Sequence, residues 1–271
     1  MTSARSLDKV VAITGASAGI GRAIAERAAA DGAAVVLSAR RAALLREVAD
    51  GITSRGGRAL AVPGDVTREA DMRDLVARAV GAFGRLDVMI CNAGIGFHDT
   101  FAATPPDVMR RLVDVNLMGT LYAAHAAAAE FRAQDSGHII AVSSVVARRG
   151  IAGSSVYSAT KSAQVGLIEG LRAEFFGTKI HASIVYPIST ATEFHAAIKR
   201  DFGHEVHGRG PKQSADDVAR AVVECIRHPK AEVYPYPRAW WLAVLSVVAP
   251  ATADRLVQKY SRRTAGGESH S

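Results

Sequence analysis

Short apolar segments rich in β-branched residues alternate along this chain with longer segments of helical character. Nearly every position of these segments is apolar, rather than every second one, which predicts strands covered on both faces. Regular alternation of strand and helix implies right-handed crossovers, and hence a doubly wound parallel α/β sheet. The expected strands are Val10–Thr14, Ala34–Ser38, Ala59–Val62, Leu86–Cys91, His138–Val142, Ile180–Val185 and a short one near Glu232–Tyr234.

Two helix starts carry capping sequences. Thr104 precedes two prolines and Asp107, and Ser214 stands three residues before Asp217. A hydroxyl at the N-cap and a carboxylate three residues later can each satisfy a backbone N–H of the first turn. We therefore expect Thr104 and Ser214 to cap helices.

No linker, repeat or low-complexity stretch divides the chain before its last ten residues, so we expect one domain over residues 1–271. Two regions interrupt the strand–helix rhythm. Residues 193–210 are charged and punctuated by glycine, which predicts a mobile loop over a substrate pocket. Residues 239–260 form an apolar C-terminal segment. Its most apolar part, 239–249, is too short to span a bilayer, and three interpretations stay open: core, dimer interface or peripheral membrane contact.

The formal net charge is +7, and the basic residues are dispersed or in short pairs without interleaved aromatics. This pattern argues against nucleic-acid binding and suits an anionic small molecule or a membrane surface. Cys91 and Cys225 lie far apart, which fits a reducing compartment. The first nine residues lack the apolar core of a signal peptide, so we expect a cytoplasmic protein, at most peripheral to a membrane. His195, His204 and His207 lack metal-ligand spacing, and we expect no metal.

A glycine-rich turn, Thr14-Gly15-Ala16-Ser17-Ala18-Gly19-Ile20-Gly21, joins the first strand to the first helix. Such a turn allows the backbone to approach a phosphate closely, and the helix N-terminus offers N–H groups and the positive end of its dipole. Because the turn follows the first strand and opens a helix, it predicts dinucleotide binding.

Tyr157 and Lys161 are four residues apart, which on a helix places both side chains on one face. A free tyrosine titrates near pH ~10. A unit charge at ~4 Å in an effective dielectric of ~20 is worth ~4 kcal/mol, or at most about three pKa units. We therefore expect Lys161 to lower the pKa of Tyr157 toward neutrality, where a general acid or base works best.

From about Val10 to Thr192 the chain resembles the short-chain dehydrogenase/reductase family, in its shorter single-domain branch. The resemblance rests on motifs in their proper order: Thr14-Gly15-x-x-x-Gly19-x-Gly21, Asp65-Val66, Asn92-Ala93-Gly94, Asn116, Ser143-Ser144 and Tyr157-x-x-x-Lys161. It implies a Rossmann fold and an oxidoreductase that interconverts a carbonyl and an alcohol with a nicotinamide cofactor.

The resemblance also implies a role for each matching residue. Tyr157 would exchange the proton, Ser144 would hold the substrate oxygen, and Ser143 would be a bystander. Lys161 would hold the nicotinamide ribose and lower the tyrosine pKa, while Asn116 would hold a water that relays protons. The implied cofactor contacts are Gly15, Ser17, Gly19, Ile20, Gly21, Arg40, Asp65, Val66, Asn92, Ala93, Gly94, Tyr157, Lys161, Pro187, Thr190 and Thr192.

The end of the second strand bears on cofactor choice. An acidic residue there would bind the ribose 2′-hydroxyl of NAD, but this chain has Ala39 followed by Arg40. A guanidinium suits a 2′-phosphate, so we expect a preference for NADP(H), with NAD(H) as the alternative. After the sixth strand Ile188 replaces a glycine that the family commonly has, which puts the path of this loop in question.

The expected pocket walls, Gly94–Phe97, Arg148–Ser154 and Ile188, are mostly apolar and favour an apolar small-molecule substrate. The family's habit predicts a homodimer or homotetramer. Two other functions stay open: a non-catalytic dinucleotide-binding regulator or scaffold, and an enzyme that uses bound nicotinamide for epimerisation or dehydration.

Overall fold

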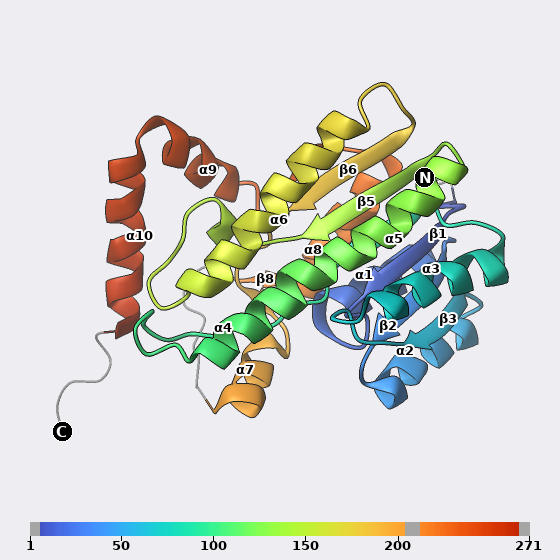
Figure 1. Ribbon diagram of the computed structural model, residues 1–271, viewed down its shortest axis with the longest axis horizontal. Coiled ribbons are helices and arrows are strands. Elements are labelled where there is room, and N and C mark those ends of the chain that lie inside the picture. Colours follow the sequence, from blue (N-terminus) through green and yellow to red (C-terminus); the bar gives the residue numbers. More distant parts are fainter. Residues whose placement is uncertain (1–5, 204–211, 266–271) are drawn as a thin grey trace.

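The computed structural model describes residues 6–203 and 212–265 of the chain. Its centre is a parallel sheet of seven strands (Figure 1). In spatial order these are β3 (Arg58–Pro63), β2 (Ala34–Ala39), β1 (Val10–Thr14), β4 (Val88–Cys91), β5 (Gly137–Val142), β6 (Ile180–Val185) and β9 (Glu232–Val233). All seven expected strands are confirmed, with ends that differ from the expected ones by at most two residues.

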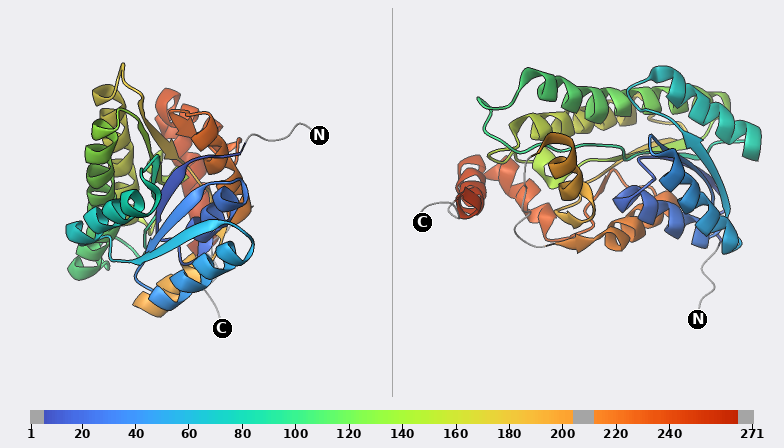
Figure 2. Two further views of the ribbon diagram at one scale, coloured as in Figure 1. Left: turned by 90° about the vertical axis from the view of Figure 1, so that its right-hand side faces the viewer. Right: turned by 90° about the horizontal axis from the view of Figure 1, so that it is seen from below.

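Helices cover both faces of the sheet, as the two views in Figure 2 show. One face carries α1 (Gly19–Ala30), α2 (Ala42–Ser54) and α8 (Ala215–Arg227), and the other carries α3 (Glu69–Phe83), α5 (Gly119–Ala133) and α6 (Ser155–Glu174). Successive residues of β1 point to opposite faces, so Val11 packs with the first group and Ala12 with the second. This is the doubly wound α/β fold that the apolar strands predict.

The two expected caps have different outcomes. The Ser214 hydroxyl accepts a hydrogen bond from the N–H of Asp217 at 3.0 Å, and this capping box opens α8. The expectation for Thr104 is wrong, because its hydroxyl donates to the carbonyl oxygen of Thr100 at 2.8 Å. Helix α4 (Pro106–Leu112) instead begins after Pro105, and it continues into α5 through a π-helical turn, η1 (Val113–Met118).

The described parts of both regions outside the sequence rhythm contain helices. Residues 194–202 form α7 (Phe194–Phe202) rather than a loop, while the expected mobile residues 204–210 lie outside the described ones. The segment 239–260 falls within two helices, α9 (Ala239–Val248) and α10 (Pro250–Ala265), which project from one end of the molecule (Figure 1). Only Ala239 of α9 is buried, so the interpretation of this helix as core is wrong. Among the described residues no helix combines the length and apolarity needed to cross a membrane.

Candidate active site

A cavity of about 1120 Å³ opens at the carboxyl ends of β1, β4 and β5. The strand order reverses between β1 and β4. From β1 the chain continues to β2 and β3 on one side of the sheet, and it then returns to form β4 on the other side of β1. Open parallel sheets bind ligands at such a switch point. The fold therefore places the cavity where a dinucleotide would be expected.

Most of the predicted site residues line this one cavity. Those that do are Gly15, Ser17, Gly19, Ile20, Arg40, Asp65, Val66, Asn92, Ala93, Gly94, Ser144, Tyr157, Lys161, Pro187, Thr190 and Thr192. Gly21 and Asn116 are not among the lining residues. Gly21 lies against Gly15, and Asn116 is bonded to Ile95; both of these partners line the cavity.

The glycine turn has the backbone shape that the sequence predicts. Gly15 and Gly19 have φ values of +67° and +57°, a region that side chains with a Cβ rarely adopt. A Cβ at Gly21 would lie 2.4 Å from the carbonyl oxygen of Gly15, so only glycine fits there. No side chain caps the N-terminus of α1, and its first turn contains no acidic residue. The turn thus presents backbone N–H groups and a positive dipole end to the cavity.

Thr14 and Asn92 hold this turn against β4. The Thr14 hydroxyl accepts hydrogen bonds from the N–H groups of Asn92 and Ala93 at 3.0 and 3.1 Å. The Asn92 amide donates to the carbonyl oxygens of Thr14 at 2.9 Å and Gly15 at 3.3 Å. The Asn92 side chain therefore fixes the turn, and Thr14 is a supporting residue whose role the sequence motif alone did not assign.

Two arginines stand together at the end of β2. Arg40 and Arg41 both line the cavity, and Arg41 contacts the Ser17 hydroxyl at 3.3 Å and the Glu193 carboxylate at 3.4 Å. The motif drew attention to Arg40 alone, although a second guanidinium follows directly in the sequence. The pair gives this end of the cavity a cationic rim.

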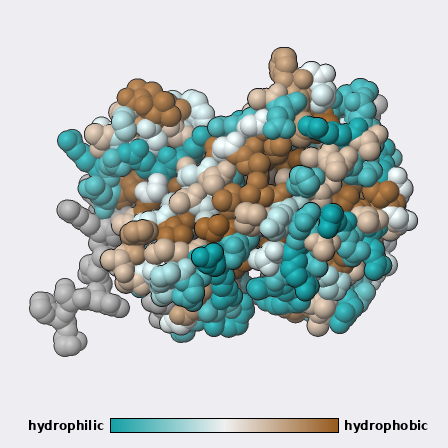
Figure 3. Space-filling view, in the orientation of Figure 1, coloured by the Kyte–Doolittle hydropathy of each residue, from teal (hydrophilic) through white to brown (hydrophobic). Residues whose placement is uncertain are grey.

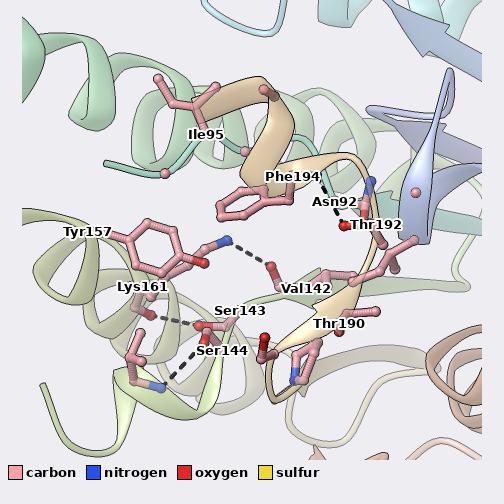
Figure 4. Close-up of a pocket in the computed structure, with 18 of the residues that line it drawn as sticks. Asn92, Ile95, Val142, Ser143, Ser144, Tyr157, Lys161, Thr190, Thr192 and Phe194 are labelled. Carbon is pink, nitrogen blue, oxygen red and sulfur yellow. Dashed lines mark hydrogen bonds between the residues drawn. The ribbon is translucent and has the colours of Figure 1, made fainter. Parts of the chain in front are cut away.

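Tyr157, Lys161 and Ser144 meet at the other end of the cavity (Figure 4). The first two lie on α6 and face the same side, and Ser144 follows β5. The Lys161 ammonium lies 5.8 Å from the centre of the Tyr157 ring and donates to the carbonyl oxygen of Val142 at 3.0 Å. Ser143 turns away and donates to the carbonyl oxygen of Lys161 at 2.9 Å, as expected of a bystander.

The expected lowering of the Tyr157 pKa is wrong for this arrangement. Burial raises the pKa of Tyr157 to about 12, and the hydrogen bond from Ser144 offsets only part of that effect. Burial also lowers the pKa of Lys161 to about 8. The spacing of Tyr157 and Lys161 places the ammonium beside the phenol, but desolvation disfavours the charged form of both groups.

Asn116 is fully buried within the π-helical turn η1. Its amide accepts from the N–H of Ile95 at 2.8 Å and donates to the carbonyl oxygen of Ile95 at 2.9 Å. The backbone carbonyl oxygen of Asn116 accepts hydrogen bonds from the Gln164 amide and the Thr120 hydroxyl, each at 2.8 Å. Both lone pairs of that oxygen therefore have protein donors, and the relay water expected at Asn116 stays a prediction.

Helix α7 and the C-terminal helices line part of the cavity. Phe194 lies 6.1 Å from Tyr157 between ring centres, and Figure 4 shows it across the cavity from Ser144. A Cβ at Gly96 would lie 2.6 Å from the Phe194 ring, so α7 packs directly on the Gly94–Phe97 segment. Leu242 of α9 and Val257 of α10 also line the cavity, a contribution that the sequence motifs did not indicate.

Ile188 forms part of the wall beside the other expected segments. Asp135 is the one residue other than glycine with a positive φ in the described chain, so Ile188 needs no glycine-like backbone. The described residues contain no group of His, Cys, Asp or Glu suited to a metal, and His204 and His207 lie outside them.

The donor set fits a nicotinamide dinucleotide. The glycine turn and the N-terminus of α1 suit its pyrophosphate, the ends of β2 and β3 suit its adenosine half, and Lys161 with Thr192 stands where the nicotinamide half would reach. A Cβ at Gly19 would lie 3.3 Å from Thr192, so Thr192 borders the turn directly.

The fold and this site together define a class of nicotinamide-dependent oxidoreductases with a single Rossmann sheet. The family model described as short chain dehydrogenase matches residues 9–202, and the chain belongs to this family. The chain is 30% identical over 254 residues to "Ketoacyl reductase HetN" of Nostoc, an alignment that covers 92% of this chain and 88% of the relative.

Solved structures of short-chain dehydrogenases share the fold of this chain. A short-chain dehydrogenase/reductase from Burkholderia phymatum in complex with NAD has a TM-score of 0.82 and 25% identity, covering 90% of this chain and 94% of that one. A short-chain dehydrogenase from Burkholderia cenocepacia J2315 in complex with NADP has a TM-score of 0.73 and 31% identity, covering 85% and 96%. The protein is an oxidoreductase of the CH–OH/C=O type that uses a nicotinamide dinucleotide.

Proposed function

We propose that this protein is an NADP(H)-preferring oxidoreductase that interconverts an apolar ketone and its secondary alcohol, with Tyr157 as the general acid and base. The observation that carries the proposal is the meeting of Tyr157, Ser144 and Lys161 in one cavity that is continuous with the glycine turn. A carbonyl oxygen held there would face a proton donor and a hydroxyl donor together.

The bound cofactor would supply or accept the hydride at the carbonyl carbon. In the direction of reduction, the Ser144 hydroxyl donates a hydrogen bond to the substrate oxygen, and the Tyr157 hydroxyl gives that oxygen its proton as the C–H bond forms. In oxidation, the same phenol oxygen takes the proton back. Lys161 holds the ribose, and the hydrogen bond from Ser144 offsets part of the rise that burial causes in the pKa of Tyr157.

Asn116 acts in this proposal as a positioning residue. It fixes the backbone of Ile95, which follows the Asn92–Gly94 segment at the end of β4 and lines the cavity. Gly94 lies close to both Asn116 and Lys161. A Cβ added at this position would lie 3.3 Å from the Asn116 amide oxygen and 3.5 Å from the Lys161 ammonium.

The substrate class follows from the rest of the lining. Ile95, Phe97, Ile151, Ile188 and Phe194 surround the space beyond Tyr157 with apolar surface. A ketoacyl reductase among the relatives is compatible with such a pocket, because an acyl chain is itself apolar. Assembly as a homodimer or homotetramer through α5 and α6 belongs to the same proposal.

The test is a panel of ketones and secondary alcohols incubated with NADPH or NADH, with turnover followed by absorbance of the reduced nicotinamide. We expect turnover of at least one apolar ketone, and a loss of about 10²–10⁴-fold in kcat for Tyr157→Phe while the cofactor still binds. Cofactor binding without turnover of any compound by the wild-type protein would favour a regulator or scaffold instead. Turnover without net consumption of cofactor would favour epimerisation or dehydration.

A further inference from the structure

Helix α9 is apolar on all sides yet lies at the surface. Its sequence is Ala-Trp-Trp-Leu-Ala-Val-Leu-Ser-Val-Val, and only Ala239 is buried. Its one polar side chain is that of Ser246. The Ser246 hydroxyl donates a hydrogen bond to the carbonyl oxygen of Leu242, in the same helix, at 2.7 Å. A helix that is apolar all round is normally enclosed by protein or by lipid.

Large apolar side chains of this region are strongly exposed. The exposed fractions are 67% for Trp241, 82% for Val247 and 77% for Val248, and Leu256 of α10 is 52% exposed. Figure 1 shows α9 and α10 projecting as a hairpin, and Figure 3 shows a compact apolar patch where the two helices join. A contiguous patch of this kind marks an interaction surface, whereas single exposed apolar residues do not.

The hairpin is fixed to the body of the protein. The Arg149 guanidinium donates to the Asp254 carboxylate at 2.7 Å and to the carbonyl oxygen of Pro250 at 3.0 Å. Ala253 is fully buried, and Leu242 and Val257 line the cavity. One side of the hairpin therefore belongs to the enzyme, and the exposed side is held in a defined orientation.

The charge of the hairpin favours an anionic surface as the partner. In the sequence of residues 238–265 the basic residues are Arg238, Arg255, Lys259, Arg262 and Arg263, and the only acidic residue is Asp254. Five basic residues minus one acidic residue give a net charge of +4 for this segment. Each basic residue near an anionic leaflet contributes about 1 kcal/mol.

The chemistry of the exposed side favours lipid over protein. Trp240 and Trp241 pack edge to face with ring centres 4.8 Å apart, and paired indoles prefer the boundary between headgroups and acyl chains. A helix of ten residues is about 15 Å long, half the thickness of a hydrocarbon core, so it would lie along the surface rather than cross it.

We propose that the α9–α10 hairpin docks this protein on the surface of an anionic lipid bilayer. Trp241, Val247 and Val248 enter the acyl boundary, and the net positive charge of the segment favours the anionic headgroups. The opposite side of the hairpin borders the cavity, so docking places the cavity next to the bilayer.

Sedimentation of the full-length protein with vesicles tests this proposal without any measurement of activity. We expect binding to phosphatidylcholine vesicles that contain phosphatidylglycerol, much weaker binding to phosphatidylcholine alone, and release as salt screens the charges. The triple variant Trp241→Ser, Val247→Ser, Val248→Ser should bind at least about tenfold more weakly, because the apolar area that would enter the lipid is lost.

Two further variants separate the alternatives. Phe176→Ser, which removes a 90% exposed apolar side chain elsewhere on the surface, should bind vesicles as the wild type does. Arg255→Glu should weaken binding to the anionic vesicles while leaving the apolar face intact.

Failure of the wild type to bind anionic vesicles would overturn the proposal. It would also be overturned if the triple variant had a smaller mass than the wild type by sedimentation equilibrium, because the face would then join two copies of the chain. Neither outcome depends on whether the enzyme turns over a ketone, so the proposed function stands or fails separately.

Discussion

Asn116 holds both backbone groups of Ile95 with the two ends of its side-chain amide. The N–H of Ile95 donates to the amide oxygen at 2.8 Å, and the amide nitrogen donates to the carbonyl oxygen of Ile95 at 2.9 Å. A third bond, at 3.1 Å, joins the amide nitrogen to the Thr160 hydroxyl. The π-helical turn, the loop after β4 and helix α6, which carries Tyr157 and Lys161, are thereby connected at one residue.

Replacing Asn116 by alanine should weaken both stability and catalysis. Two backbone groups of Ile95 lose their partners, and each unpaired group costs about 1–3 kcal/mol, so we expect the free energy of unfolding to fall by about 2–6 kcal/mol. Displacement of the Gly94–Ile95 wall should lower kcat at least about tenfold. Urea unfolding and turnover measure the two effects.

The matched control for this amide is Gln258→Ala, on the exposed surface of α10. It should change the free energy of unfolding by less than about 0.5 kcal/mol. Equal effects of the two substitutions would show that the Asn116–Ile95 hydrogen bonds do not hold the loop after β4 in place.

Gly21→Ala should damage the nucleotide turn although Gly21 does not line the cavity. The new Cβ would lie 2.4 Å from the carbonyl oxygen of Gly15 and 2.5 Å from the Asn92 amide nitrogen, so the turn must shift. We expect a destabilisation of about 1–3 kcal/mol and a raised cofactor Kd, measured by thermal unfolding and by nucleotide fluorescence titration.

Gly81→Ala provides the comparison, since an added Cβ on this exposed helical residue meets no atom within 4 Å. It should stabilise the protein by about 0.5–1 kcal/mol and leave the cofactor Kd unchanged. A Gly21→Ala variant with wild-type affinity would show that the turn tolerates a side chain.

Local patterns explain why the strands were predictable. An apolar run such as Val10–Thr14 needs no knowledge of distant residues to be identified as a buried strand, and the order of the motifs then brings Gly15, Ser144 and Tyr157 to one edge of the sheet. The rest depends on tertiary packing. Desolvation of Tyr157 and Lys161 follows from what encloses them, and no residue spacing encodes it.

Tertiary packing also explains why the expectations for Thr104 and for α9 differ from the structure. Thr104 has the right neighbours for a cap, but the turn before it engages its hydroxyl. The exposure of α9 depends on where the hairpin sits against the body, so an apolar run alone could not separate core from surface.

Arg40 and Arg41 should set cofactor preference together. Loss of a charged hydrogen bond to a 2′-phosphate costs about 1.5–3 kcal/mol, or about 10–150-fold in affinity. We therefore expect Arg40→Ala to raise the KM for NADPH at least about tenfold and to change the KM for NADH little. Arg41→Ala should raise the KM for NADPH in the same selective way, since Arg41 lines the same end of the cavity and contacts Ser17 in the turn.

Arg46→Ala is the matched control, because Arg46 is exposed on α2 and does not line the cavity. Its KM for either cofactor should stay at the wild-type value. The preference would have another origin if Arg40→Ala affected NADPH and NADH equally.

His138 should make the protein sensitive to acid. This residue of β5 is buried, and its Nε2 lies 2.7 Å from the Ser183 hydroxyl, which itself donates to the carbonyl oxygen of Lys230 at 2.5 Å. The imidazole must therefore donate through Nε2, and its Nδ1 has no partner among the described residues. A second proton on Nδ1 would be buried without an acceptor. Burial, and then the charge of His181, lower the pKa of His138 to about 3.

The direction of the pH effect follows from this lowered pKa. The unfolded chain takes up a proton on His138 below pH ~6.5, whereas the folded protein does so only near pH 3. The free energy of unfolding should therefore fall as the pH drops from 6.5 toward 3, by up to about 5 kcal/mol from this group, and be fully recovered above 6.5. Urea unfolding at a series of pH values measures this effect. Between pH 6.5 and 3, the free energy of unfolding should fall less steeply for His138→Gln than for the wild type. His228→Gln, at an exposed position, is the control and should show the same pH dependence as the wild type. If His138→Gln and the wild type lost stability equally on acidification, His138 would already bind its second proton in the folded state.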